Sequence, residues 1–289
     1  MAETSLSSIN QLFTESWELT KKRFWPLVLL WLIQGLIVAL ILAGTIFALL
    51  GTSLGSMMNI ETSELTATST GSADTAVIDS LLTNFGVIFL AVMLAIFIIA
   101  IVLGPLFQAA MIALVASEEK ISLGQALKVG WKKFLPVFLA GLLMMFFIVG
   151  GGVVLLIPGI FFAILFSFVF YEIVLYDLPL MDALKSSAGM VKQHFWAVVG
   201  RMSLVFLLAI GIGLISDSLS NANSLIFSII DLVLNLGYSV FAVMYSVTLY
   251  KNLRIAAGGA KMSLMPITVI SALGWLGIIL LVSNVLQNL

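Results

Sequence analysis

The chain has 289 residues, of which 62% are hydrophobic and 9% are charged, and its formal net charge at pH 7 is −1. Soluble domains carry about 25% charged residues, so this composition excludes an ordinary soluble domain and indicates repeated membrane crossings. The chain contains no cysteine, which excludes disulfides, thiolate metal ligands and a cysteine nucleophile.

The thirteen basic residues fall into four short clusters, at residues 21–23, 120–133, 185–201 and 251–261. Each of the three intervals between clusters has room for two membrane crossings, and the tail after the last cluster has room for one. Cytoplasmic loops retain Lys and Arg, whereas loops on the far side are depleted of them. The clusters therefore predict seven spans, with the N-terminus in the cytoplasm and the C-terminus outside.

The first 25 residues are polar and amphipathic, and they lack the basic start and short apolar core of a cleaved signal peptide. We therefore expect the apolar stretch that follows, at 26–50, to be a retained first span. The next residues, to about 84, are rich in Ser, Thr and Gly and contain four acidic residues but no basic one. This composition predicts a loop on the outside.

The second apolar stretch, at 85–116, is longer than one straight crossing needs, and Gly104 and Pro105 lie inside it. Proline removes a backbone donor and clashes with the preceding helical turn, which predicts a kink at this point. Two interpretations stay open. The kink either serves helix packing or forms a hinge for transport.

Residues 134–176 are hydrophobic throughout. As a single helix they would be about 64 Å long, about twice the thickness of the hydrocarbon layer, so the chain must fold back. Pro158 and Gly159 are the expected apex, because the residue before proline leaves the helical region and glycine accepts positive φ. The predicted third and fourth spans are 136–156 and 160–176.

The predicted fifth span, 197–215, is followed by the polar and acidic sequence SDSLSNANS, which predicts a second outside loop. The sixth and seventh spans are predicted at 225–250 and 264–286. The expected domains are a six-span membrane domain over 1–255, and a cytoplasmic linker with the seventh span over 256–289.

A short pattern recurs at three of the basic clusters: KRFWP at 22–26, KKFLP at 132–136 and, more loosely, KQHFW at 192–196. Apolar residues at helical spacing precede each copy, which predicts three amphipathic interfacial helices, each followed by a transmembrane hairpin. Ser122 and Gln125 have capping-box spacing at the start of the second. Membrane anchoring and specific lipid recognition both remain open for this unit. The expected anchors are Phe24, Trp25, Trp131, Phe134, Phe195 and Trp196.

Few polar groups lie inside the spans. Glu172 and Arg201 are each about one turn inside the cytoplasmic end of their spans, so their matching depth predicts an ion pair. The pair would act either as a structural clasp between helices or as part of a proton relay. Three consecutive glycines, at 150–152, predict close helix packing, with a local helix break as the alternative.

The sequence offers few signatures of catalysis. His194 is its only histidine, and it contains no HExxH or Walker glycine motif. A GxSxG match occurs at 51–55, in the predicted outside loop rather than at a strand-to-helix turn. The spans hold no cluster of carboxylates for a metal. We expect no enzymatic activity, no cofactor and no metal site. Nucleic-acid binding is not expected either, because the basic residues are few and lie along membrane-facing helices. The expected partners are membrane lipids and a protein partner or a second copy of the chain.

The stretch 155–196, LLIPGIFFAILFSFVFYEIVLYDLPLMDALKSSAGMVKQHFW, resembles the YciC-like bacterial inner-membrane family. That family is related to the membrane domain found in front of some glycerophosphodiester phosphodiesterases. The YKNLR sequence at 250–254 also fits, and the resemblance covers roughly 5–255. It implies a six-span module with no assigned reaction. A catalytic phosphodiesterase barrel has no room here and would need more than one histidine. The seventh span lies beyond the resembling region.

These observations together favour a non-enzymatic integral protein of the bacterial cytoplasmic membrane, acting as a scaffold or as a lipid- or partner-binding module. The alternative is a transporter or permease component for a small or lipidic substrate. A polar cavity at the midplane, lined by broken helices, would favour transport, whereas a packed apolar bundle would favour a scaffold.

Overall fold

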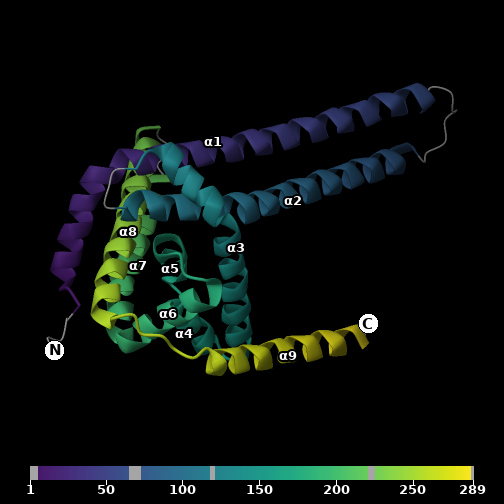
Figure 1. Cartoon of the computed structure of the whole chain (residues 1–289). Helices are drawn as coiled ribbons and strands as arrows, with labels where there is room; N and C mark the ends of the chain where they lie inside the picture. Colours follow the sequence, from purple (N-terminus) through teal and green to yellow (C-terminus); the bar gives the residue numbers. More distant parts are fainter. Residues whose placement is uncertain (1–5, 65–72, 118–120, 221–224, 288–289) are drawn as a thin grey trace. The chain divides into compact units, whose positions relative to one another are not determined.

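The computed structural model describes residues 6–64, 73–117, 121–220 and 225–287, and all regular secondary structure in these ranges is α-helical (Figure 1). The described residues form nine helices: α1 Ile9–Glu64, α2 Ala73–Ala116, α3 Leu123–Val154, α4 Leu156–Leu165, α5 Val169–Tyr176, α6 Leu180–Gln193, α7 Phe195–Ser220, α8 Leu225–Ala257 and α9 Met265–Gln287.

Among the described residues, seven helical stretches are long and apolar enough to cross a membrane: Ile9–Ala48, Phe89–Ala116, Leu123–Val154, Leu156–Tyr176, Phe195–Ser218, Leu225–Ala257 and Met265–Gln287. They follow the order of the seven predicted spans, which confirms an all-α, multi-pass membrane fold. The division into three repeats stays a prediction.

The chain divides into two compact units. Unit 2 comprises residues 31–104, which are the apolar arms of α1 and α2. Unit 1 comprises residues 1–30 and 105–289, with helices α3 to α9 and the remaining parts of α1 and α2. The predicted first outside loop is shorter than expected, because α1 continues to Glu64 and α2 begins at Ala73. The residues between them lie outside the described ranges.

At two positions an interfacial helix was predicted to end before a span begins, but the structure has one continuous helix there. Helical residues continue through Pro26 in α1 and through Pro136 in α3. Ser122 caps α3 as predicted. Its hydroxyl accepts from the Gln125 N–H, and the Gln125 side chain accepts from the Ser122 N–H.

The reversal between α3 and α4 occurs at Leu155, whose extended backbone separates the two helices. The predicted apex at Pro158 and Gly159 is therefore wrong by three residues. Both residues lie in the first turn of α4, where proline loses no helical hydrogen bond. Gly159 serves close packing instead, since a Cβ there would lie 2.8 Å from the Cα of Gly152.

The predicted fourth span consists of two helices, α4 and α5, separated by a turn at 166–168. This interruption was not predicted. It lies in the core, because Leu165, Phe166, Phe168 and Val169 are all buried. The break therefore leaves buried backbone N–H and C=O groups without helical partners, and these groups need partners from elsewhere in the fold.

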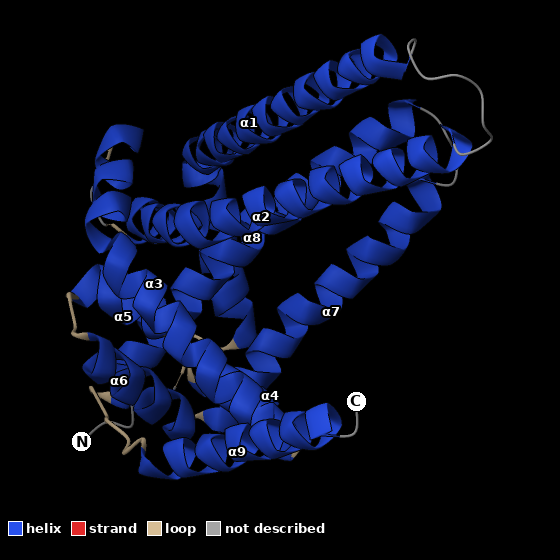
Figure 2. Ribbon diagram, turned by 90° about the vertical axis from the view of Figure 1, so that its right-hand side faces the viewer, coloured by secondary structure: helices blue, strands red, loops and turns tan. Residues whose placement is uncertain are grey.

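Helix α6 was predicted to lie at the membrane surface with its apolar face in lipid. The lipid covering of that face is wrong, and the place at the membrane surface stays a prediction. The helix packs against α4, α5 and α8, beside α5 in Figure 2. Residues 186–191 are all buried. The linker after α8 covers this helix, since the Met262 N–H donates to the Lys185 carbonyl at 3.0 Å. Gly189 lies directly against the backbone of Ala260 and Lys261. Protein, rather than lipid, therefore covers most of the apolar face.

The predicted triglycine contact is confirmed as close packing, because α3 continues unbroken through 150–152. Gly150 faces α9, and a Cβ there would lie 2.6 Å from the Ser271 carbonyl oxygen. Gly151 faces Phe162 of α4. Two hydrogen bonds join α9 to α3, from Ser271 Oγ to the Phe147 carbonyl and from Trp275 Nε1 to the Phe146 carbonyl, each at 3.0 Å. The seventh span is therefore bound to the six-span part at the glycine crossing.

Candidate functional site

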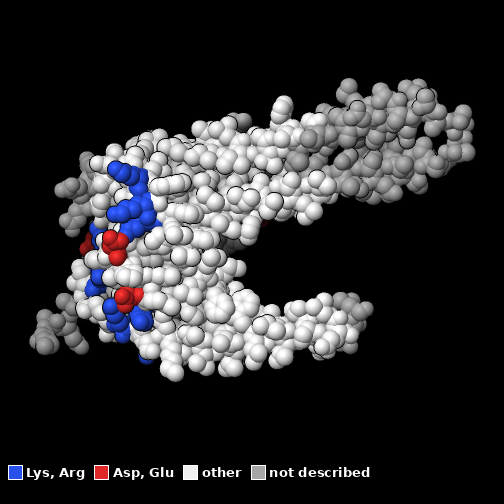
Figure 3. Space-filling model, turned by 45° about the vertical axis from the view of Figure 1, so that its right-hand side comes forward, with Lys and Arg blue, Asp and Glu red and all other residues white. Residues whose placement is uncertain are grey.

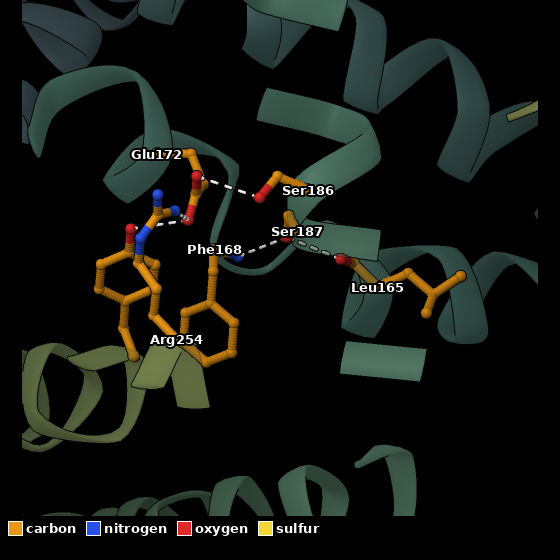
Figure 4. A network of polar contacts seen from close by, with 7 residues as sticks. Leu165, Phe168, Glu172, Ser186, Ser187 and Arg254 are labelled. Carbon is orange, nitrogen blue, oxygen red and sulfur yellow. Dashed lines mark hydrogen bonds and ion pairs between the residues drawn. The ribbon is translucent and has the colours of Figure 1, made fainter. Parts of the chain in front are cut away.

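Glu172 of α5 is an acidic residue that is fully buried in unit 1. Its Oε1 accepts from the Tyr250 hydroxyl at 2.8 Å and forms an ion pair with Arg254. Its Oε2 accepts from Ser186 Oγ at 3.1 Å. Figure 4 shows Ser186 of α6 and Arg254 of α8 beside the Glu172 carboxylate of α5. A buried charge is tolerated when it is paired and hydrogen-bonded, and both oxygens meet that condition here.

Arg254 is held from a second side. Its guanidinium lies over the ring of Tyr176 at 3.4 Å from the centroid, within the range of a cation–π interaction. The ring of Tyr250 stacks on that of Tyr171 at 5.0 Å. We define Glu172, Ser186, Tyr250 and Arg254 as the Glu172 clasp. The clasp fixes the end of α5 against α6 and α8.

The predicted ion pair between Glu172 and Arg201 is wrong. Arg201 donates to the Ala197 carbonyl at 3.0 Å and to the Ser7 carbonyl at 2.7 Å. Among the described residues, the cation paired with Glu172 is Arg254. The sequence contains a signal for this pairing, because Tyr250 and Arg254 are four residues apart and so share one helix face. Arg254 was assigned instead to the cytoplasmic basic cluster as a topology signal.

Ser187, next to the clasp on α6, stabilises the break between α4 and α5 (Figure 4). Its hydroxyl accepts from the Phe168 N–H at 3.3 Å and donates to the Leu165 carbonyl at 2.8 Å. One side chain thus satisfies a backbone donor and a backbone acceptor that the turn releases. Of the two adjacent serines of α6, Ser186 therefore bonds to the buried carboxylate, and Ser187 bonds to the backbone at the buried helix break.

We expect Ser187→Ala to lower the free energy of unfolding by about 1–3 kcal/mol, because it leaves a buried backbone N–H unpaired. Ser203→Ala is the matched control, since Ser203 is exposed and its hydroxyl donates only to the Val199 carbonyl of its own helix. Reversible unfolding in mixed detergent micelles measures both. Equal losses in the two variants would show that Ser187 has no special part in holding the break.

Further contacts involve residues of the predicted cytoplasmic clusters. Arg23 donates to the Leu114 and Ser117 carbonyls at 2.6 and 2.8 Å, and Lys261 pairs with Asp182 at 3.3 Å. In Figure 3 the visible Lys and Arg residues, with Asp and Glu among them, gather at one edge of the surface. This agrees with the charge pattern, which predicts that the basic clusters share one face.

Asp177 ends α5 in the left-handed conformation, with φ 54°, and forms an ion pair with Lys133 of α3. The hydrogen bond from Lys133, together with its positive charge, lowers the pKa of the Asp177 carboxyl. Asp177 is strongly exposed, so water weakens the contribution of this pair to stability. The pair joins the C-terminal end of α5 to α3.

The expected interfacial anchors divide into two groups. Trp25, Trp131 and Trp196 are strongly exposed. Phe24, Phe134 and Phe195 are partly covered, for example by stacking of Phe134 on Trp131 and by contact of Phe195 with Phe161. The tryptophan rings are thus free to contact lipid head groups, and anchoring itself stays a prediction.

Helical residues continue through Gly104 and Pro105 in α2, at the position where the chain passes from unit 2 to unit 1. A packing kink and a transport hinge both stay predictions for this site.

Within the described ranges, the structure contains no group of three or more His, Asp or Glu that could hold a metal ion. The Glu172 carboxylate accepts from three protein side chains, those of Ser186, Tyr250 and Arg254. Comparison with protein-family models, curated proteins and solved structures found no match for this chain.

Proposed function

We propose that this chain is a non-enzymatic integral protein of the bacterial cytoplasmic membrane that acts as a scaffold or as a lipid- or partner-binding module. The observation that carries this proposal is that the buried Glu172 carboxylate and the buried α4–α5 break are both bonded by protein side chains. Glu172 has protein donors on both oxygens, and Ser187 satisfies the helix break. A bundle closed in this way suits binding at its surface better than passage through its interior. The proposed bacterial origin rests on the YciC-like resemblance.

The proposed orientation places the N-terminus in the cytoplasm and the C-terminus outside, from the positions of the basic clusters. We expect a cysteine at Lys128 to react with an impermeant thiol reagent only in inside-out vesicles. A cysteine at Ser69, which lies outside the described residues, should react only in right-side-out vesicles. The chain has no native cysteine, so each label reports one site. Labelling with the opposite sidedness would reverse the proposed topology.

A transporter or permease component for a small or lipidic substrate is the second candidate. The specific observation in its favour is the interruption between α4 and α5, one turn from the buried charge of Glu172. Transporters commonly place substrate or ion sites at interrupted helices in the membrane. In that case the carboxylate would exchange its protein donors for a substrate or a proton during the cycle.

Native purification followed by mass spectrometry of bound lipids and proteins tests the scaffold proposal. The expected result is a stoichiometric lipid or protein partner, with no solute flux when the chain is reconstituted into liposomes. Solute or lipid flux that is lost in Glu172→Gln, while that variant stays folded, would overturn the scaffold proposal in favour of transport.

A further inference from the structure

An apolar groove of about 530 Å³ lies between the start of α1 and the α7–α8 hairpin. Its walls are Phe13, Thr14, Trp17, Leu208, Ile212, Val233, Leu234, Gly237, Tyr238 and Phe241. The rings of Phe13 and Phe241 are in contact, with centroids 4.9 Å apart, which brings α1 against α8 at this point. The Tyr238 hydroxyl donates to the Val205 carbonyl at 3.0 Å and joins α8 to α7. The groove thus has defined walls from three helices, and its volume is in the range of ligand sites, about 300–1,000 Å³.

The groove continues into a second hollow of about 400 Å³, which shares Trp17 and Gly237 with it. The other residues lining this hollow are Thr20, Lys21, Phe24 and Trp25, so the continuous groove changes from apolar walls to an aromatic and basic end. The Lys21 ammonium lies 5.8 Å from the centre of the Trp17 ring and pairs with Glu18 at 2.9 Å. Lys21 is the basic residue that lines this end of the groove.

We infer that this groove binds one anionic phospholipid, with an acyl chain along the apolar walls and the phosphate at the Lys21 end. The helices that form it expose large apolar side chains beside it, such as Leu207 and Leu232. In a membrane such faces contact lipid, so an acyl chain is the molecule available to fill the groove. Tryptophan and lysine are the residues that meet head groups and anionic lipid charge. This inference rests on the proposed binding function and names its ligand class.

Gly237 allows a direct test, because it lines both hollows and a Cβ there would have no atom within 4 Å. Gly237→Leu therefore fills the groove without disturbing its walls. Gly213→Leu is the matched control. It makes the same change in α7, also in open space, at a position that lines neither hollow. Both substitutions raise helix propensity by the same amount, so a difference in lipid retention between them is not explained by a difference in helix stability.

The full chain is reconstituted into nanodiscs of mixed phosphatidylglycerol and phosphatidylcholine, and the lipids retained after release into detergent are counted by native mass spectrometry. We expect the wild type and Gly213→Leu to retain one phosphatidylglycerol. Gly237→Leu should retain it about tenfold more weakly, because the leucine excludes roughly two methylene groups from the groove.

The charged end is tested separately with Lys21→Gln. We expect it to lower the preference for phosphatidylglycerol over phosphatidylcholine about fivefold, since one basic residue near an anionic lipid contributes about that factor. Lys128→Gln, at an exposed position on α3, should leave the preference unchanged.

Equal retention by Gly237→Leu and Gly213→Leu would overturn the lipid site, as would retention with no head-group preference, or a protein segment seated in the groove. The proposed scaffold function would survive each of these results if a protein partner still co-purified. Solute flux would instead overturn the proposed function, whatever the groove holds.

Discussion

Replacing Arg254 by glutamine is expected to lower the free energy of unfolding by about 3–5 kcal/mol, which is the cost of removing one partner of a buried ion pair. Glu172 is fully buried, so the variant leaves a charge that water cannot reach. The Arg254 side chain is 22% exposed, so Glu172→Gln should cost less, because the arginine can turn toward water or the head groups. Unfolding in mixed detergent micelles measures both variants.

The double variant Glu172→Gln/Arg254→Gln supplies the control. If the two side chains interact directly, its loss should be smaller than the sum of the single losses, because the second change removes a group that the first has already left unpaired. Arg201→Gln combined with Glu172→Gln should be additive, since Arg201 bonds to backbone carbonyls of Ala197 and Ser7. Coupling with Arg201 but not with Arg254 would contradict the clasp.

The second large effect is expected at the crossing of α3 and α9. The backbones of Gly150 and Gly274 are so close that a Cβ at Gly274 would overlap the Gly150 carbonyl. Gly274→Leu should therefore destabilise the chain by about 3 kcal/mol through overpacking. It should also separate α9 from α3, and so remove the hydrogen bonds that Ser271 and Trp275 donate.

Gly277→Leu is the matched control, because it lies one turn further along α9 with no atom within 4 Å of a Cβ. It should be neutral or slightly stabilising through its helix propensity. Unfolding in micelles and disulfide cross-linking between cysteines at Phe146 and Trp275 would report both stability and the contact. Equal stability and equal cross-linking of the two variants would show that α9 is not seated on α3 through Gly274.

Most of the membrane fold was predictable from the sequence because it depends on local properties. Long apolar stretches gave all seven spans, the Ser122 capping box gave the start of α3, and the triglycine gave a close helix contact. The position of the α3–α4 turn was missed by three residues, because proline is tolerated in the first turn of a helix as well as just before it.

The candidate site could not be predicted in the same way because its partners are distant in sequence. The residues at the α4–α5 break, Phe166 to Phe168, include no proline or glycine, and the break depends on Ser187 some twenty residues later. The amphipathic pattern of α6 showed that one face is covered, but it could not distinguish a covering of lipid from one of protein. Similarly, matching depth in the membrane predicted Arg201 as the ion-pair partner of Glu172, whereas the packing of the helices places Arg254 in that position.

We propose that the polar groups around Glu172 are closed to water, and labelling of a cysteine at Ser186 tests this most directly. Ser186 is buried against Glu172, and the chain has no native cysteine to interfere. Gln193→Cys, at an exposed position at the end of the same helix, reports that the reagent reaches the protein. A scaffold predicts that Ser186→Cys stays unlabelled by a small water-soluble reagent in vesicles of either orientation, while Gln193→Cys is labelled from one side. Labelling of Ser186→Cys from either side would contradict the account and indicate an aqueous path to Glu172.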